Sequence, residues 1–265
     1  MRSVLLPLAL PIAAIACTAS SAPPPATGAN PFTTTVVADF DAPWAMTFLP
    51  DGRMLVTEKK GQLLLVSADG KDRQVVSGTL PVDSAGQGGL MDVVLAPGFA
   101  KNRLVYFSFS ENGAEGKGVV LARGKLVERP VACVRAPCPP VASLEGVEVL
   151  HRATPYVRGS GHYSGRIAFS PDGKYMFYAN GERQKFTPAQ DPKMSLGKVL
   201  RLTLDGKPAP GNPLAAKGFD PAIWSYGHRN LLGLAFDAQG RLWEQEMGPE
   251  GGDEVNLIEP GKNYG

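Results

Sequence analysis

Three polar side chains in glycine-containing loops stand just ahead of strand-like segments, where they could act together in catalysis. They are Gln87 in AGQGGL, His162 in GSGHYSGR and Arg229 in YGHRNL. An imidazole can serve as a general base, whereas a guanidinium can bind a carboxylate or stabilise developing negative charge. An amide can hold a hydroxyl or a carbonyl group. Because the three loops have equivalent places relative to the strands that follow, we expect them to converge on one mouth.

Two more side chains extend this group. Glu182, in NGER, ends the predicted hairpin that begins after His162. A hairpin returns its second strand beside its first, so this carboxylate is placed to orient the imidazole. The alternative for Glu182 is an ordinary carboxylate on a surface turn. Asn230 follows Arg229 directly and offers an amide to a carbonyl group.

The segment EMGPEGGDE at 246–254 sets carboxylates among residues that let backbone carbonyls turn inward. Carbonyl oxygens of Gly248 and Pro249, together with Asp253 and Glu254, could surround calcium, which binds six to eight oxygen ligands. The spacing differs from that of an EF-hand loop. An acidic turn in solvent is the alternative.

The elements that must position these loops recur along the chain. FLPDGR at 48–53, FSPDGK at 169–174 and FDAQGR at 236–241 each lead into a second strand-like run. MDVVLAP at 91–97, followed by RLVYFSFS, is a fourth and more divergent unit of strand, turn and strand. Recurring all-β units predict a β-propeller. A β-sandwich with coincidentally similar turns is the alternative.

Further strand patterns fit between these units. Residues 62–76 predict a hairpin that turns at Asp69 and Gly70, and residues 198–210 predict a strand that ends at Asp205 and Gly206. After the first residues, amphipathic helical spacing is absent from the sequence. A propeller must close to protect its edges, so four units indicate either a four-bladed ring or an incomplete piece of a larger one. We expect the incomplete piece.

The composition is that of an ordinary globular chain. Of its 265 residues, 43% are hydrophobic, which is enough for a sizeable core. The formal net charge of +2 indicates no nucleic-acid partner.

The N-terminal residues 1–17 predict an export signal, with a basic residue, a short apolar run and then small residues. AIAC at 14–17 resembles a bacterial lipobox, which predicts lipidation of Cys17 and attachment to a membrane. Cleavage near Ala22 to a soluble periplasmic protein is the alternative. Residues 18–30 predict a disordered tether, and 31–265 a partial propeller domain. The expected location is the periplasm or cell envelope of a bacterium.

The other two cysteines, Cys133 and Cys138, lie close together in a proline-rich segment. Export would place them in an oxidising compartment, which favours a local disulfide over free thiols. A metal site is disfavoured because no histidine or further cysteine lies nearby in the sequence.

Four segments resemble successive motifs of the quinoprotein glucose and sorbosone dehydrogenases, which include the periplasmic aldose sugar dehydrogenases. The segments are GQGGLMDVVLAPGF, GHYSGRIAFSPDGKYMFYANGE, IWSYGHRNLLGLAFD and EQEMGPEGGDEVNLIEPGKNYG. The resemblance extends from about Val36 to Gly265. It implies a six-bladed propeller that carries pyrroloquinoline quinone (PQQ) and calcium on its axis. The implied reaction oxidises the anomeric carbon of aldoses to lactones and passes electrons to an external acceptor.

The same resemblance implies roles for five of the residues introduced above. His162 would take the proton of the C1 hydroxyl while hydride passes to the quinone, and Glu182 would orient it. Gln87 would lie on the substrate side. Arg229 and Asn230 would contact the cofactor, and Arg229 would also meet negative charge that develops during the reaction.

Metal ligands are implied as well. The carbonyls of Gly248 and Pro249 would hold the calcium of PQQ, and Glu254 and Tyr264 would belong to a second, structural calcium site. The sequence departs from the family pattern at 163–165, where Tyr-Ser-Gly replaces Phe-Gly-Gly.

The sequence therefore predicts an exported, PQQ-dependent aldose dehydrogenase. Two alternatives stay open. One is a non-catalytic propeller that binds sugars or a protein. The other is a lactonase in which calcium polarises an ester carbonyl.

Overall fold

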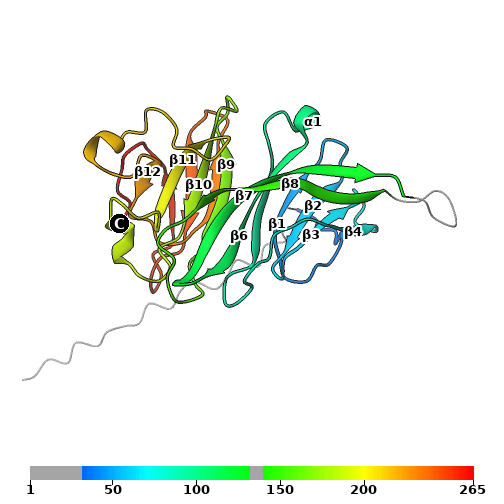
Figure 1. The fold of residues 1–265 in the computed structure, drawn as a ribbon, viewed down its shortest axis with the longest axis horizontal. Helices are drawn as coiled ribbons and strands as arrows, with labels where there is room; N and C mark the ends of the chain where they lie inside the picture. The colour runs from blue at the N-terminus through cyan, green and yellow to red at the C-terminus, as the bar shows by residue number, and fades with distance from the viewer. Residues whose placement is uncertain (1–31, 132–139) are drawn as a thin grey trace, which may run out of the picture. The chain divides into compact units, whose positions relative to one another are not determined.

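Four antiparallel sheets follow one another along the chain, as the colours from blue to red in Figure 1 show. The computed structural model describes residues 32–131 and 140–265, and Val37–Gly265 form one compact unit. The predicted export signal, its lipidation residue Cys17, the tether and the pair Cys133 and Cys138 lie outside the described residues.

Each of the first three sheets is a four-stranded meander in chain order. The first contains β1 (Pro43–Phe48), β2 (Met54–Glu58), β3 (Gln62–Val66) and β4 (Arg73–Val76). The second contains β5 (Leu90–Leu95), β6 (Leu104–Gly113), β7 (Gly116–Arg129) and β8 (Val141–Arg152). The third contains β9 (Ser164–Phe169), β10 (Tyr175–Asn180), β11 (Lys198–Thr203) and β12 (Ile223–Tyr226).

The fourth sheet has three strands among the described residues: β13 (Leu231–Phe236), β14 (Leu242–Glu246) and β15 (Glu254–Leu257). The described helices are short: α1 (Phe99–Asn102) and the 3-10 turns η1 (Thr187–Gln190) and η2 (Ala215–Lys217). Across the described ranges, no helix has the length and apolar character that crossing a membrane requires.

Glycine makes the recurring tight turns. Gly52, Gly173 and Gly240 have φ angles of 88°, 69° and 74°, a left-handed conformation that glycine adopts without a steric penalty. Each turn joins the first two strands of its sheet. The structure therefore confirms the strand, turn and strand units that the sequence predicts.

The first strands of the four sheets are neighbours in space. β5 contacts both β1 and β9, and β9 also contacts β13. Successive sheets that meet along their first strands form the blades of a propeller. The predicted all-β propeller class, with four blades in this chain, is confirmed, and the loops that enter these strands must lie close together.

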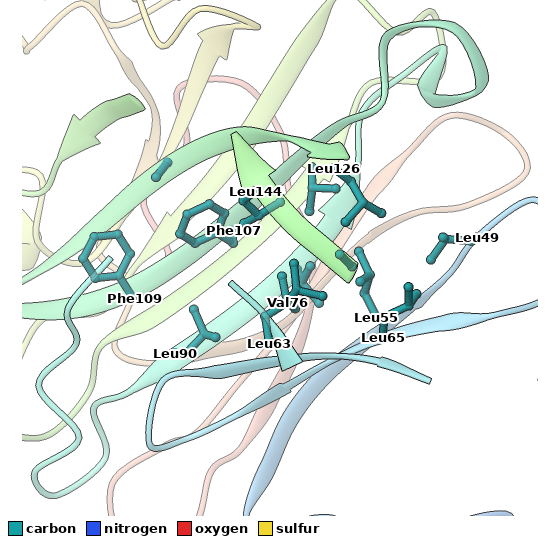
Figure 2. Packing of buried hydrophobic residues seen from close by; sticks show 14 of the residues in the cluster. Leu49, Leu55, Leu63, Leu65, Val76, Leu90, Phe107, Phe109, Leu126 and Leu144 are labelled. Atoms are coloured by element: carbon teal, nitrogen blue, oxygen red, sulfur yellow. The ribbon is translucent and has the colours of Figure 1, made fainter. Parts of the chain in front are cut away.

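Side chains that alternate along each strand fill the spaces between blades. On β6, Phe107 packs in the cluster shared by the first and second sheets, and Tyr106 packs in the cluster shared by the second and third. Figure 2 shows the first of these clusters, which contains Leu55 and Leu65 of the first sheet and Phe107 and Leu144 of the second. On β10, Tyr178 and Phe177 divide in the same way between the second and third clusters. Burial of both faces explains why the strands in these sheets are hydrophobic runs.

The histidine of β8 provides a test of this packing. Burial lowers the pKa of His151 to about 4, and its ring lies edge-on to Tyr178 at 6.2 Å. An unfolded histidine binds a proton near pH 6.5, so the unfolded chain holds more protons between pH 6.5 and 4. Stability should therefore fall as the pH is lowered through this range, by at most about 3 kcal/mol from this residue.

We expect His151→Phe to flatten the pH dependence of unfolding while it keeps the aromatic contact. Urea unfolding at pH 7, 6, 5 and 4 measures the difference between the two proteins. Parallel stability curves for the variant and the unsubstituted chain would contradict a buried, neutral His151.

Candidate active site

His162 lies in the loop that enters β9, in a backbone conformation that few residues with a side chain adopt. Its φ angle is 48°, and only 2% of its surface is exposed. Non-glycine residues with positive φ are uncommon and often occur at functional sites. Ser164, Arg183 and Gln184 also have positive φ, so the unusual backbone is concentrated around this imidazole.

Glu182 follows β10 and contacts His162, as the hairpin geometry predicts. Its Oε1 lies 2.5 Å from Nδ1 of His162. Its Oε2 accepts hydrogen bonds from the backbone N–H groups of Lys185 and Phe186. Because Oε2 is occupied by two N–H donors, Oε1 is the oxygen left to accept a hydrogen bond from Nδ1–H of His162. With the ring proton on Nδ1, Nε2 is the atom that can accept a proton.

A buried arginine fixes the histidine loop. Arg183 is 1% exposed, and its guanidinium donates to the carbonyls of Gly161, Lys117 and Gly159 at 2.7 to 2.9 Å. It also stacks over the ring of Tyr163 at 3.6 Å. Burial lowers the pKa of Arg183. These contacts tie the loop before His162 to the second sheet.

Gln87 enters from the preceding blade and contacts the same loop. Its side-chain oxygen accepts the backbone N–H of His162 at 2.7 Å, and its own N–H donates to the carbonyl of Ser160. The amide nitrogen of the side chain is thus the group that remains for a ligand. The structure brings the predicted Gln87 and His162 loops together.

Arg229 and Asn230 join this group from the next blade. The backbone carbonyl of Arg229 accepts the N–H of Glu182 at 2.8 Å, and Asn230 contacts Ser164 across the blade boundary at 3.4 Å. Glu246 accepts the backbone N–H groups of both Arg229 and Asn230 through Oε2. All five predicted catalytic and cofactor residues therefore lie in one connected cluster.

One of the two predicted calcium carbonyls, that of Gly248, lies directly beside the Arg229 side chain. Its guanidinium donates to the carbonyl of Met247 at 3.0 Å and to that of Gly248 at 3.2 Å. Asp253 accepts the N–H of Gly248 at 3.0 Å, which closes the loop upon itself. A carbonyl oxygen has two lone pairs, so Gly248 can still bind a cation.

A cavity of about 280 Å³ opens over these groups and is lined by residues that include Glu182, Arg229, Gly248 and Pro249. A second cavity of about 350 Å³ is lined by Gln87, Ser164 and Asn230, among others. Met247 borders both cavities. The first cavity therefore offers the guanidinium of Arg229 and backbone carbonyls, and the second offers side-chain amides and a hydroxyl.

Glu254 and Tyr264 are engaged in separate contacts. The hydroxyl of Tyr264 donates to the carbonyl of Leu257 and accepts the N–H of Glu259, both at 2.7 Å. The carboxylate of Glu254 accepts from the amide of Asn256 at 2.8 Å. Both residues line the cavity of about 280 Å³, and their calcium role remains a prediction.

Sequence reasoning missed the contributions of Arg183, His228 and Glu246. Arg183 directly follows Glu182 in the sequence, but an arginine in a turn predicts exposure, and only the fold shows that it is buried. The ring of His228 is fully buried, stacked on Tyr264 at 4.9 Å and hydrogen-bonded to Ser225 and Glu246. Pairing of the two predicted strands could have identified Glu246, because it lies opposite Leu231, which comes directly after Arg229 and Asn230.

Comparison with known proteins gives consistent matches. The model of the glucose/sorbosone dehydrogenase family matches residues 40–265. The chain is 39% identical over 230 residues to aldose sugar dehydrogenase YliI of Escherichia coli, covering 85% of this chain and 58% of that protein. It is 28% identical to quinoprotein glucose dehydrogenase B of Acinetobacter calcoaceticus, covering 87% of this chain and 51% of that protein.

A solved structure shows the same fold. The PQQ-bound form of aldose sugar dehydrogenase from Streptomyces coelicolor is 34% identical, with a TM-score of 0.72, over 87% of this chain and 64% of that chain. The chain thus spans about half to two thirds of the length of the relatives that it matches.

Proposed function

Because this chain belongs to the glucose/sorbosone dehydrogenase family, we propose that it serves in PQQ-dependent oxidation of aldose sugars at the anomeric carbon, giving lactones. The observation that carries this proposal is the buried pair of His162 and Glu182. The imidazole is 2% exposed, its partner Glu182 lines the first cavity, and the neighbouring Ser164 lines the second.

The residues around the cavity of about 280 Å³ fit PQQ and calcium. PQQ carries several carboxylates, and Arg229 supplies a guanidinium whose Nε is buried and has no partner among the described residues. Gly248 and Pro249 line the same cavity and offer the hard oxygen ligands that calcium prefers. When bound, PQQ would supply the acceptor for the hydride that leaves C1 of the sugar. Arg229, Asn230, Gly248 and Pro249 are the residues that would hold the pair.

The chain's own residues would handle the proton and the sugar. Nε2 of His162 would take the proton of the C1 hydroxyl, and the ionised Glu182 would stabilise the imidazolium that results. The side-chain nitrogen of Gln87 would donate to a sugar oxygen. Arg183 would keep the histidine loop in place through its three carbonyl contacts.

The remaining sequence predictions belong to the same proposal. We propose export to the periplasm or cell envelope, lipid attachment at Cys17, a disulfide between Cys133 and Cys138, and a structural calcium at Glu254 and Tyr264. An external electron acceptor would complete the turnover.

The proposal is tested with the longest polypeptide that the gene encodes around this chain. It is incubated with PQQ and calcium, and dye reduction and product are measured with several aldoses. We expect lactone formation that requires PQQ and is lost when calcium is chelated. Lactone hydrolysis without PQQ would instead support the lactonase, and sugar binding without turnover would support a non-catalytic propeller.

A further inference from the structure

One buried cluster lies behind the proposed active site and has no part in the reaction described above. His228 precedes β13, and Glu244 and Glu246 lie two residues apart on β14. One potential ligand atom from each of the three side chains lies within 4.8 Å of the others. The exposed fractions of the three residues are 0%, 2% and 3%. Two carboxylates and an imidazole are thus enclosed together.

One carboxylate oxygen of the cluster has no hydrogen-bond partner in the described part of the chain. Glu246 is satisfied, because Oε1 lies 3.1 Å from Nδ1 of His228 and Oε2 accepts two backbone N–H groups. Glu244 accepts from Asn256 through Oε1, but its Oε2 is buried without a partner in the described part of the chain. A buried carboxylate needs a proton or a cation to offset its desolvation.

We propose that His228, Glu244 and Glu246 form a binding site for a divalent transition metal, with zinc as the best-fitting ion. Imidazole nitrogen and carboxylate oxygen are both zinc ligands, whereas calcium prefers oxygen alone. Ligand atoms on a tetrahedral zinc with bonds of about 2.0 Å lie about 3.3 Å apart. The 3.1 Å separation of His228 Nδ1 and Glu246 Oε1 is close to that spacing.

A partner for the far side of the imidazole and an access route are also present. Nε2 of His228 lies 2.8 Å from the hydroxyl of Ser225. A hydroxyl can accept a hydrogen bond from Nε2 when Nδ1 binds the metal, and such contacts orient metal-bound histidines. His228 and Glu246 both line the cavity of about 280 Å³, which provides a path for the ion and space for water as a fourth ligand. The metal would tie the loop before β13 to β14.

The test measures zinc directly and needs no enzyme activity. The chain, Glu244→Gln and the control Glu259→Gln are stripped of metal and dialysed against zinc in excess calcium, and bound zinc is then measured by mass spectrometry. Gln has the shape of Glu and can keep the contact with Asn256, whereas Glu259 is an exposed acid that follows β15 in the chain. We expect Glu244→Gln to bind one zinc fewer than the other two proteins, with at least about 100-fold lower affinity at this site.

Thermal unfolding with and without zinc provides the second measurement. Zinc should raise the melting temperature of the chain and of Glu259→Gln, but not that of Glu244→Gln, which should still fold without metal. Cobalt added in place of zinc should give visible absorption that is lost in the same variant. Equal zinc binding by all three proteins, or calcium displacing the zinc, would overturn the proposal. If zinc bound only to the cysteines or to other surface groups, all three proteins would bind it equally.

Discussion

His162→Gln is expected to lower the rate of PQQ-dependent aldose oxidation by about 10²–10⁴-fold, the usual contribution of a positioned general base. Gln fills a similar space but has no atom that can accept a proton from the C1 hydroxyl. The neighbouring carboxylate of Glu182 lies on the Nδ1 side of the ring, and its Oε2 is held by two backbone N–H groups, so it is not placed to substitute for Nε2. Initial rates of dye reduction at saturating PQQ measure the loss.

His151→Phe is the matched control, because it removes another histidine, one that lies on β8, outside the candidate active site. It should retain the activity of the unsubstituted protein near neutral pH. PQQ binding by His162→Gln should also be retained, since the cofactor contacts proposed above come from Arg229 and Asn230. Full activity of His162→Gln would exclude it as the base.

Glu182→Gln is expected to lower the rate of PQQ-dependent aldose oxidation by a similar factor, about 10²–10⁴-fold, because it changes the tautomer of His162. The backbone N–H groups of Lys185 and Phe186 both donate to Oε2, so the amide oxygen of Gln must occupy that position. The amide N–H₂ would then face Nδ1 of His162 and force the ring proton onto Nε2. The atom that should accept the substrate proton would already carry one.

Nitrogen NMR of the protein labelled at histidine distinguishes this positioning role from a general loss of structure. The spectrum should show the proton on Nδ1 in the unsubstituted protein and on Nε2 in Glu182→Gln, with the melting temperature little changed. Glu182→Asp keeps the negative charge and should restore part of the activity. An unchanged tautomer accompanied by full activity would contradict the role of Glu182.

The sequence predicted the blade units well because their cues are local. Turns such as the one at Gly52 need a left-handed residue, and alternating hydrophobic residues identify strands that are buried on one or both faces. The proximity of Gln87, His162 and Arg229 could also be predicted from their positions in the sequence, because the three loops enter the first strands of adjacent sheets. These parts of the fold depend on short stretches of chain.

The parts that the sequence could not predict depend on contacts between distant residues. Burial of Arg183 results from carbonyls supplied by β7 and by the histidine loop. The enclosure of Glu244 depends on how β14 packs and pairs, and alternation along a strand does not say which acid will lack a partner. The contact of Arg229 with Gly248 likewise depends on the path of a loop rich in glycine.

The central claim is that this chain provides the base that takes the proton of the C1 hydroxyl of an aldose while hydride leaves C1. The most direct test compares rates of PQQ-dependent oxidation for glucose and for glucose deuterated at C1, in the longest product of the gene. We predict a slower rate with the deuterated sugar, transfer of the label away from the lactone product, and loss of both rates in His162→Gln. Equal rates for the two sugars in single-turnover experiments, or turnover that does not require PQQ, would contradict the account.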